Sequence, residues 1–406
     1  MKDADGVRNI PKIIQNIKEP LVVVVSAMGK TTNAMEMITH AYLKNDRVTL
    51  KNKLIEVKNF HSKIIKELFG NENGSESFLE QFEHLEVKLD KKPSLHYDFE
   101  YDRIVSFGEL MSSAIINDFF YQENLKFNLV DIRTVLKTDD IYRDANVNWE
   151  LTVELMQKTF NFDISNIYLT QGFLGGTLTN LSTTLGREGS DYSAAILGFA
   201  LNATDVTIWK DVPGVMNADP RWYSDAQKID QLSYNEAIEL SYYGAQVIHP
   251  KTLKPLQNKS IPLYVKSFLN PEQSGTIISS SKSKKFDVPI FVIKQNQVFV
   301  TISPKDYSFI PEDKLIEIIT IFKKYRIKIN QMQNSALHFS ACFDKNRHTD
   351  ELFEFLKSDF FVRYNENAEL ITIRNYNPSA IEQMTKDKII LNSQVTRKMA
   401  MFVLVV

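Results

Sequence analysis

The sequence has 406 residues, and it is notable for what it lacks: disulfide partners, an excess of charge and long apolar runs. Its one cysteine, Cys342, cannot form an internal disulfide, so folding needs no oxidising compartment. The 48 basic and 50 acidic residues give a net charge of −2, without the basic excess that neutralises nucleic-acid phosphates. The apolar run Leu21–Val25 is too short to cross a bilayer, and no signal-peptide pattern precedes it. We therefore expect a cytoplasmic protein that binds neither nucleic acid nor membrane.

Metal-ligand patterns are also missing, and glycine is scarce. The seven histidines show no paired spacing and no cysteine cluster exists, so we expect no protein-built metal site. Only 14 residues are glycine, yet five of them lie between Gly172 and Gly189, and none follows Gly275. Special backbone geometry is therefore concentrated in one short stretch. The length itself indicates two or three domains.

The first 280 residues repeat a strand–turn–helix order. The strand candidates are short runs rich in apolar residues: Leu21–Val25, Arg103–Ser106, Asn128–Asp131, Ile167–Leu169 and Asp205–Trp209. The main helix candidates have apolar residues at helical spacing: Thr31–Lys44, Leu110–Tyr121 and Tyr192–Ala203. We expect Ser190 and Asp191 to cap the last of these helices. This repetition predicts an α/β fold with a parallel sheet.

The pattern changes after the polar, lysine-rich segment Ser279–Pro289, which we interpret as a linker. The strands predicted beyond it are Ile290–Ile293, Val298–Ile302, Ile327–Gln331, Leu337–Phe343, Glu369–Arg374 and Met399–Val405. The predicted helices are Lys314–Tyr325, Thr349–Lys357 and Pro378–Thr385. This order predicts two short α+β units, of which the second is less complete.

The glycine-rich stretch Thr183–Asp191 has the chemistry of an anion site. Glycines let successive N–H groups point into one concavity, and a following helix N-terminus adds positive charge. Arg187 adds a fork that matches carboxylate or phosphate oxygens, and the Thr183, Thr184 and Ser190 hydroxyls add donors. The alternative is an ordinary strand–helix loop with Arg187 in solvent.

The stretch Val22–Asn33 ends like a Walker A loop, because Gly29-Lys30-Thr31 follows a strand. The first glycine of that pattern would fall at Val24, inside the strand, so the loop is too short to wrap a phosphate chain. We reject the P-loop interpretation. There remains a turn that presents the Ser26 and Thr32 hydroxyls at the carboxyl end of a strand, where α/β proteins bind ligands.

Two further stretches carry charged groups beside turns. Glu109 lies in the predicted turn Phe107–Glu109, just after a predicted strand, and either accepts from a substrate ammonium or complements a helix dipole. Lys210 and Arg221 flank a second turn, where they are candidates for nucleotide phosphates, and Asp211 is a candidate for the ribose or adenine.

Taken together, these stretches resemble aspartate kinases of the amino acid kinase family. The resemblance rests on VVVVSAMGKTTN, SFGELMS, QGFLGG, TTLGREGSDYSAA, IWKDVPGVMNADPR, SYYGAQVIHPKTLKPL and SGTII. It implies transfer of the γ-phosphoryl group of ATP, with Mg²⁺, to the β-carboxylate of L-aspartate, the first step toward lysine, threonine and methionine. It also implies a three-layer, carbamate-kinase-like α/β domain over residues 1–280, a linker over 281–289, and tandem ferredoxin-like ACT units over 290–406.

The resemblance also assigns roles to individual residues. Those similar to the aspartate site are Ser26, Thr32, Glu109, Phe173, Arg187 and Ser190. Glu109 would receive the ammonium and Arg187 the α-carboxylate, and Asp191 would orient a catalytic lysine. The catalytic residues within this chain would be Asp191 and Lys210. Those similar to nucleotide contacts are Lys210, Asp211, Met216, Arg221 and Gln246, although Gln246 stands where many relatives have lysine.

For the tail, the resemblance implies binding of a feedback amino acid, with lysine the first to test. The effector contacts would be Gln331, Met332, Asn334 and Ser335. ACT units pair side by side, so we expect a homodimer through them or a higher homo-oligomer.

The sequence departs from the family at its start. Relatives open with a strand that ends in lysine-phenylalanine-glycine-glycine-threonine-serine, and Met1–Asn9 matches the segment directly after that motif. Either the start is misassigned or truncated, or the chain is a degenerate paralogue that only binds amino acids. We favour the first explanation because the aspartate and nucleotide residues are present. Phosphoryl transfer depends on positioning and charge neutralisation, so we expect little turnover from the chain as written and recovery once upstream codons are restored.

Two other functions remain open on sequence grounds. A kinase for another small acid, such as acetylglutamate, would keep the glycine-rich loop but would not need the ACT tail. A purely regulatory ACT subunit would not need Glu109, Arg187 and Asp191 together. Substrate-dependent release of ADP distinguishes these possibilities.

Overall fold

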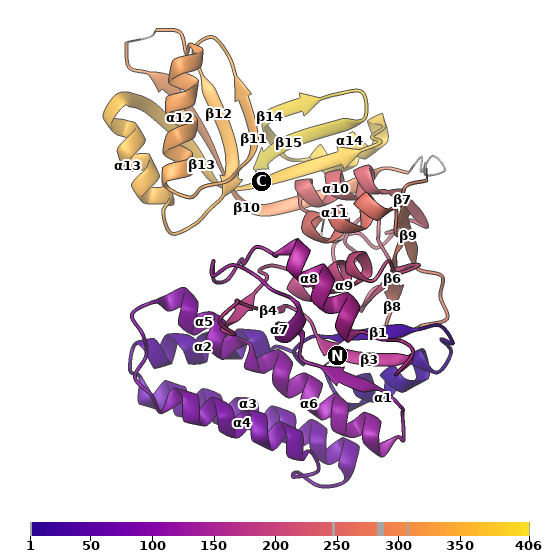
Figure 1. The fold of residues 1–406 in the computed structure, drawn as a ribbon. Coiled ribbons are helices and arrows are strands. Elements are labelled where there is room, and N and C mark those ends of the chain that lie inside the picture. The colour runs from indigo at the N-terminus through magenta and orange to yellow at the C-terminus, as the bar shows by residue number, and fades with distance from the viewer. Residues whose placement is uncertain (1, 246–247, 282–287, 307, 406) are drawn as a thin grey trace. The chain divides into compact units, whose positions relative to one another are not determined.

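The computed structural model describes residues 2–245, 248–281, 288–306 and 308–405. The chain divides into two compact units (Figure 1). The first unit comprises Met1–Gly214, Asp230–Tyr234 and Ile248–Ser281. The second unit comprises Val215–Ile229, Asn235–Val247 and Lys282–Val406.

Two main sheets form the framework of the first unit. One has the order β1-β3-β2, is parallel, and consists of β1 (Leu21–Val25), β3 (Ile167–Gln171) and β2 (Asn128–Val130). The other has the order β6-β8-β9-β7 and consists of β6 (Val206–Lys210), β8 (Leu263–Ser267), β9 (Thr276–Ser279) and β7 (Gln231–Ser233). A short antiparallel pair joins β4 (Leu174–Gly176) to β5 (Ser182–Thr184). Pairing is parallel except between β8 and β9 and in this short ribbon, which agrees with the predicted α/β class.

Helices cover both faces of the β1–β3 sheet; in Figure 1, α3, α4 and α6 lie on one side and α8 and α9 on the other. The helices of this unit are α1 (Ala4–Ile14), α2 (Thr31–Leu43), α3 (Arg47–Phe69), α4 (Glu76–Leu89), α5 (Tyr97–Val105), α6 (Phe107–Gln122), α7 (Ile132–Val135), α8 (Trp149–Thr159), α9 (Gly189–Ala200) and α11 (Pro250–Lys259). Throughout the described part of the chain, no helix is both long and apolar enough to span a bilayer.

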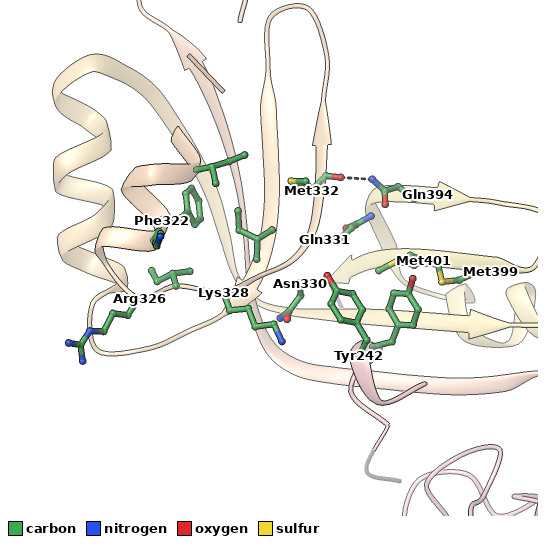
Figure 2. A pocket seen from close by; sticks show the side chains of 15 residues that line it. Tyr242, Phe322, Arg326, Lys328, Asn330, Gln331, Met332, Gln394, Met399 and Met401 are labelled. Atoms are coloured by element: carbon green, nitrogen blue, oxygen red, sulfur yellow. Dashed lines mark hydrogen bonds between the residues drawn. The ribbon is translucent and has the colours of Figure 1, made fainter. Parts of the chain in front are cut away.

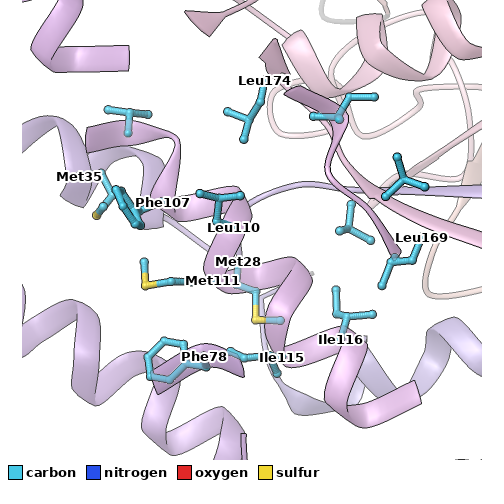
Figure 3. Close-up of a cluster of buried hydrophobic side chains, with 14 of the residues drawn as sticks. Met28, Met35, Phe78, Phe107, Leu110, Met111, Ile115, Ile116, Leu169 and Leu174 are labelled. Atoms are coloured by element: carbon cyan, nitrogen blue, oxygen red, sulfur yellow. The ribbon is translucent and has the colours of Figure 1, made fainter. Parts of the chain in front are cut away.

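The core of the first unit lies between these helices and the parallel sheet. Figure 3 shows its centre, where the labelled side chains are Met28, Met35, Phe78, Phe107, Leu110, Met111, Ile115, Ile116, Leu169 and Leu174. Helix α6 is buried almost all round, because α4 packs on one side of it and β1 and β3 on another. A helix that is apolar on every side needs such double cover. The position of α6 therefore depends on both neighbours.

The predicted strand Arg103–Ser106 is wrong, because this segment is the end of helix α5. The apolar pair Ile104-Val105 suggested a strand, but with Tyr97 and Tyr101 it forms a stripe at spacings of four, three and one residues, which is helical. Acidic residues between these positions, among them Glu100 and Asp102, hid this stripe. In the structure these two are buried too, and Asp102 bonds to backbone groups of other segments.

The predicted cap of α9 is also wrong. The helix begins at Gly189, and the residue before it, Glu188, is in the left-handed region with φ of 53° and makes no side-chain cap bond. Ser190 and Asp191 therefore lie in the first turn, where Asp191 still complements the helix dipole.

The second unit is built on one antiparallel six-stranded sheet of order β11-β12-β10-β13-β15-β14. Its strands are β10 (Ile290–Pro304), β11 (Ile329–Asn334), β12 (Phe339–Asp344), β13 (Phe360–Arg374), β14 (Ile389–Val395) and β15 (Met399–Val405). Its helices are α12 (Glu312–Lys324), α13 (Thr349–Asp359), α14 (Pro378–Thr385) and, from Asn235 onward, α10 (Tyr234–Tyr243).

Two long strands join the two α+β halves of this sheet. The separate strands predicted at Ile290–Ile293 and Val298–Ile302 are one strand, β10, with register shifts between Lys294 and Phe299. Strand β13 likewise begins well before the predicted Glu369. Polar residues in the middle of each strand interrupt the apolar alternation, which is why the continuity was missed.

A buried histidine makes the stability of the first unit depend on pH. His61 of α3 is fully buried, its Nδ1 lies 2.8 Å from the Val57 carbonyl oxygen, and its ring stacks on Phe78 at 5.4 Å. Burial lowers the pKa of His61 to about 4, although the Val57 bond opposes this. Protons therefore bind the unfolded chain more readily than the folded one between pH 6.5 and 4.

We expect stability to be complete above pH 6.5 and to fall as pH drops through this window, by up to about 3 kcal/mol from this one group. His61→Phe keeps the ring and should remove this part of the pH dependence. Urea unfolding at pH 7.5 and 5.0 measures it, and the difference between the parent and the variant isolates His61. An equal loss in both proteins would contradict the prediction.

Candidate functional site

The carboxyl ends of β1 and β3 lie side by side, and the Gly172 N–H donates to the Val25 carbonyl at 2.8 Å. Ser26 follows β1 directly, and its carbonyl accepts from the Ser112 hydroxyl of α6 at 2.7 Å. The next turn leads into α2, where Thr32 lies half-buried in the first helical turn. Ser26 and Thr32 are therefore presented at a strand end, as the sequence indicated.

Glu109 lies in the first turn of α6, beside this turn. Its side chain is 2% exposed, and its Oε1 accepts from the Ala27 N–H at 3.4 Å. Its Oε2 has no hydrogen-bond partner. Burial raises the pKa of Glu109 to about 8. A buried carboxylate with an unused oxygen is costly unless a donor from elsewhere fills the position.

The glycine cluster brings the loop before α9 close to the end of β3. A Cβ on Gly172 would lie 2.7 Å from Cβ of Ser190, and a Cβ on Gly189 would lie 2.4 Å from Cδ2 of Phe173. Phe173 itself has φ of 66°, and its N–H donates to the Ser193 hydroxyl at 2.9 Å. Here glycine is required mainly for close packing, which brings Phe173 and Ser190 beside the strand ends.

Two of the hydroxyls that we expected in an anion site point elsewhere. Thr183 and Thr184 are fully buried. The Thr183 hydroxyl pairs with that of Thr138 at 2.7 Å, and the Thr184 hydroxyl donates to Asp102 at 2.7 Å. Asp102 also accepts from the Arg143 N–H and the Thr184 N–H. The sequence analysis did not single out Asp102, which holds β5 and thereby the start of the glycine-rich loop.

Arg187 and Glu188 differ in their surroundings. Arg187 is exposed, and no described residue pairs with its guanidinium. Glu188 accepts from the His249 N–H at 2.7 Å, at the start of α11. This bond anchors the loop in the first unit. The exposed Arg187 side chain is available for an anion.

Asp191 and Lys210 form an ion pair at the end of β6. The Lys210 Nζ lies 2.6 Å from Asp191 Oδ2, and both side chains are partly buried. Burial raises the pKa of Asp191, and the charge of Lys210 opposes that shift. Asp211 follows and is exposed. The two residues predicted to be catalytic are therefore in contact, and the lysine lies at a strand end.

Two of the other predicted nucleotide residues fall in the second unit. These residues are Met216 and Arg221. The backbone of Met216 pairs with that of Lys228 in an isolated β-bridge, and the Arg221 Nε donates to Asp219 at 3.0 Å. Gln246 lies outside the described residues.

A pocket of about 650 Å³ lies in the second unit, along strand β11 (Figure 2). Gln331 and Met332 line it, together with Tyr242 of α10 and Met401 of β15. Gln331 is 4% exposed, and neither its amide nitrogen nor its amide oxygen has a partner. An amide left unpaired in this way is unusual in a folded protein.

The other two predicted effector residues do not line this pocket. Asn334 ends β11, and Ser335 forms the turn to β12, where its N–H donates to the His338 carbonyl at 2.8 Å. The pocket therefore contains half of the predicted set.

Comparison with known proteins decides the family, because the sequence profile of the amino acid kinase family matches residues 1–267. This chain belongs to the amino acid kinase family. Among its relatives, lysine-sensitive aspartokinase 3 of Escherichia coli is 28% identical over 84% of this chain and 76% of the relative. The aspartokinase of Chlamydia pneumoniae is 29% identical over 89% of this chain and 80% of the relative. The resemblance to aspartate kinase is thus confirmed.

Solved structures of aspartate kinases share the fold of this chain. E. coli aspartokinase III, solved in complex with aspartate and ADP, has a TM-score of 0.83 at 24% identity and covers 99% of this chain and 93% of its own. The aspartate kinase of Clostridium acetobutylicum has a TM-score of 0.77 at 20% identity, with the same coverage. The predicted architecture, an α/β kinase domain followed by ACT units, is confirmed.

Two residues of this amino acid kinase site escaped the sequence analysis, Asp102 and Glu188. Their hydrogen-bond partners lie 82 and 61 residues away in the sequence, so no local pattern could reveal them. The one signal was Glu188 itself, a charged residue between two glycines.

Proposed function

We propose that this chain is an aspartate kinase, which transfers the γ-phosphoryl group of ATP to the β-carboxylate of L-aspartate. The observation that supports this most strongly is a continuous line of contacts in the first unit. Glu109 contacts Ala27 after β1, the end of β1 contacts Gly172, Gly172 packs on Ser190, and Asp191 pairs with Lys210. A buried carboxylate, two strand ends, a helix N-terminus and a lysine therefore share one region.

The aspartate substrate fits the groups at one end of this line. We assign its ammonium to Glu109, whose Oε2 has no partner in the described structure, and its α-carboxylate to Arg187. A guanidinium matches a carboxylate with two parallel bonds. Ser26, Thr32, Phe173 and Ser190 complete the proposed pocket, which leaves the β-carboxylate toward Lys210.

The nucleotide fits the other end of the line. Phosphates bind well at a helix N-terminus, and α9 begins at Gly189 between the glycine loop and Lys210. In the transfer, a β-carboxylate oxygen bonds to the γ-phosphorus while the bond to the ADP oxygen breaks. Lys210 neutralises the charge on the transferring oxygens, and Asp191 holds its ammonium in place.

Magnesium would arrive with ATP and add positive charge at the phosphates. The described residues contain no group of three His, Cys, Asp or Glu side chains close enough to hold a metal ion. This fits an ion held mostly by phosphate oxygens and water, as Mg²⁺ commonly is. Asp211, exposed next to Lys210, is the nearest additional oxygen ligand along the chain.

Release of ADP in the presence of different acids tests the activity. With L-aspartate plus MgATP we expect little ADP release from the 406-residue chain and clear release from the extended form, with the aspartyl phosphate trapped as its hydroxamate. With N-acetyl-L-glutamate we expect no release. The assay is run on this chain and on its reading frame extended upstream of Met1. Release with acetylglutamate alone would replace the proposed substrate. Absence of turnover in both forms, with binding of an amino acid retained, would support the degenerate paralogue instead.

We further propose that the β11 pocket of the second unit binds a feedback amino acid. The unpaired Gln331 amide offers one donor and one acceptor, which suits the carboxylate and ammonium of an amino acid. From the resemblance, lysine is the first amino acid to test. The lining contains Lys323, Arg326 and Lys328 and no carboxylate, so an uncharged side chain is better matched to the charge there. Methionine and threonine are therefore tested beside lysine.

Gln331→Leu is expected to weaken binding of that amino acid about 10- to 100-fold, because a lost buried hydrogen bond costs about 1–3 kcal/mol. Titration calorimetry on the full chain with lysine, methionine and threonine measures this. Gln333→Leu is the matched control, since Gln333 lies on the same strand, is exposed and does not line the pocket. No heat with any of the three would end the proposal, and equal loss in both variants would remove Gln331 from the site.

A further inference from the structure

A second cavity, of about 300 Å³, lies in the first unit between helices α4 and α6. We call it the α4–α6 pocket; its lining includes Lys88 and Lys91 near the end of α4, Phe107 and Leu110 of α6, and Arg133 of α7. Phe107 and Leu110 are three residues apart on α6; they belong to the edge of the core, at 4% and 7% exposure, and form the apolar part of the pocket lining. None of the residues assigned above to aspartate or ATP lines this pocket.

The charges in the pocket are predominantly positive. Arg133 is compensated, because its Nη2 lies 2.6 Å from Asp131 Oδ2 and its Nη1 donates to the Ser182 hydroxyl at 3.0 Å. Lys88 is not compensated in this way. Its Nζ lies 5.1 Å above the Phe107 ring, and no described carboxylate or carbonyl accepts from it. Lys91 adds a second ammonium at the same place.

Lys88 loses hydration in this position. Burial, together with the charges of Arg103 and Arg133, lowers the pKa of Lys88 to about 8, and Glu100 opposes the shift only in part. A half-buried ammonium without an acceptor is unfavourable, because it has lost water and gained no hydrogen bond. An anion in the pocket would supply both the missing acceptor and the missing charge.

We propose that the α4–α6 pocket binds a small organic oxyanion, whose phosphate or carboxylate group pairs with Lys88 beside Arg133. The apolar part of the ligand would rest on Phe107 and Leu110. The volume supports an organic ligand, because a bare phosphate leaves most of 300 Å³ unfilled. This site is independent of the proposed kinase reaction, because Phe107 and Leu110 lie on a different face of α6 from Glu109, which contacts Ala27.

Calorimetric titration with phenyl phosphate, benzoate and inorganic phosphate tests the proposal. Phenyl phosphate or benzoate is expected to bind, and Lys88→Met to weaken that binding at least tenfold. Lys58→Met is the matched control, because Lys58 Nζ lies 5.2 Å above the Phe82 ring on the exposed side of α3 and lines no part of this pocket. The control should bind within twofold of the parent. Whichever of the two aromatic probes binds more tightly identifies the head group.

Trace acetylation of the unaltered protein gives a second readout that does not depend on folding of a variant. At pH 8 the bound probe should slow acetylation of Lys88 at least tenfold and leave Lys58 unchanged, as read by mass spectrometry. The proposal is overturned if no probe protects Lys88, or if Lys88→Met binds as tightly as the parent. Inorganic phosphate binding as tightly as phenyl phosphate would overturn the role of the apolar surface.

Discussion

Asp191→Asn is expected to lower the rate of aspartyl phosphate formation by roughly 10²–10³-fold, with a much smaller change in the affinity for aspartate. Asp191 holds the Lys210 ammonium at 2.6 Å, and that lysine is the fixed positive charge at the end of β6. An amide keeps the shape of the side chain but removes the charge that positions Lys210. Stabilisation of the transferring phosphoryl group should suffer more than binding, because the charge there develops in the transition state.

The rate is measured from the product trapped as its hydroxamate, and parent and variant are compared in the same form of the protein. Where turnover of the 406-residue chain is too slow to follow, both are made from the reading frame extended upstream of Met1. Glu369→Gln is the matched control, because Glu369 and Lys388 form an ion pair of the same 2.6 Å length in the second unit. We expect the control to stay within twofold of the parent. A rate for Asp191→Asn within threefold of the parent would remove the pair from the mechanism.

Glu109→Gln is expected to weaken aspartate binding roughly 100-fold, because a buried ammonium–carboxylate pair loses one partner. The carboxylate of Glu109 is enclosed at 2% exposure and has a free oxygen for a donor. Binding of ATP should change little, since no nucleotide contact is assigned to this residue. Calorimetry with L-aspartate and with ADP separates the two effects.

The same residue predicts how aspartate affinity depends on pH. The pKa of Glu109 is raised to about 8 in the free protein, so below pH 8 the side chain is mostly protonated. An ammonium ligand needs the carboxylate, so binding must release that proton. Affinity should therefore rise with pH from 6 to 8, by up to about tenfold per unit, and level off above pH 8.

Glu109→Gln should remove this slope, because an amide does not titrate. Glu100→Gln is the control, since Glu100 is also fully buried in the first unit but accepts from the Ser94 N–H at 2.8 Å. That variant is expected to lose stability and to keep the slope. A pH-independent affinity in the parent protein would show that Glu109 does not receive the ammonium.

Much of the fold followed from local pattern. Helix α14 (Pro378–Thr385) and strand β15 (Met399–Val405) have the bounds that the sequence predicted, because a proline at the start of the helix and a continuous apolar run in the strand mark them without help from neighbours. The prediction of a strand at Arg103–Ser106 was wrong for the opposite reason. Helix α5 buries Glu100 and Asp102 as well as apolar groups, so the polar positions that normally show the exposed face were misleading.

The candidate site divides in the same way. Glycines beside Arg187 and Asp191 indicated an anion site from their residue types, and that site stays a prediction. The direction of each hydroxyl could not be predicted. Thr183 and Thr184 turn inward because Thr138 and Asp102, distant in sequence, supply their partners.

By itself, the sequence determined the family, the α/β kinase domain with its ACT tail, and the residue types at the strand ends. Turn residues, apolar runs and motif spacing are properties of short segments, so they can be recognised before folding. The tertiary structure alone decided that, within the described part of the chain, Glu109 Oε2, the Gln331 amide and the Lys88 ammonium have no hydrogen-bond partner. Burial and pairing depend on segments far apart in the chain, and those three groups are where this protein is expected to bind ligands.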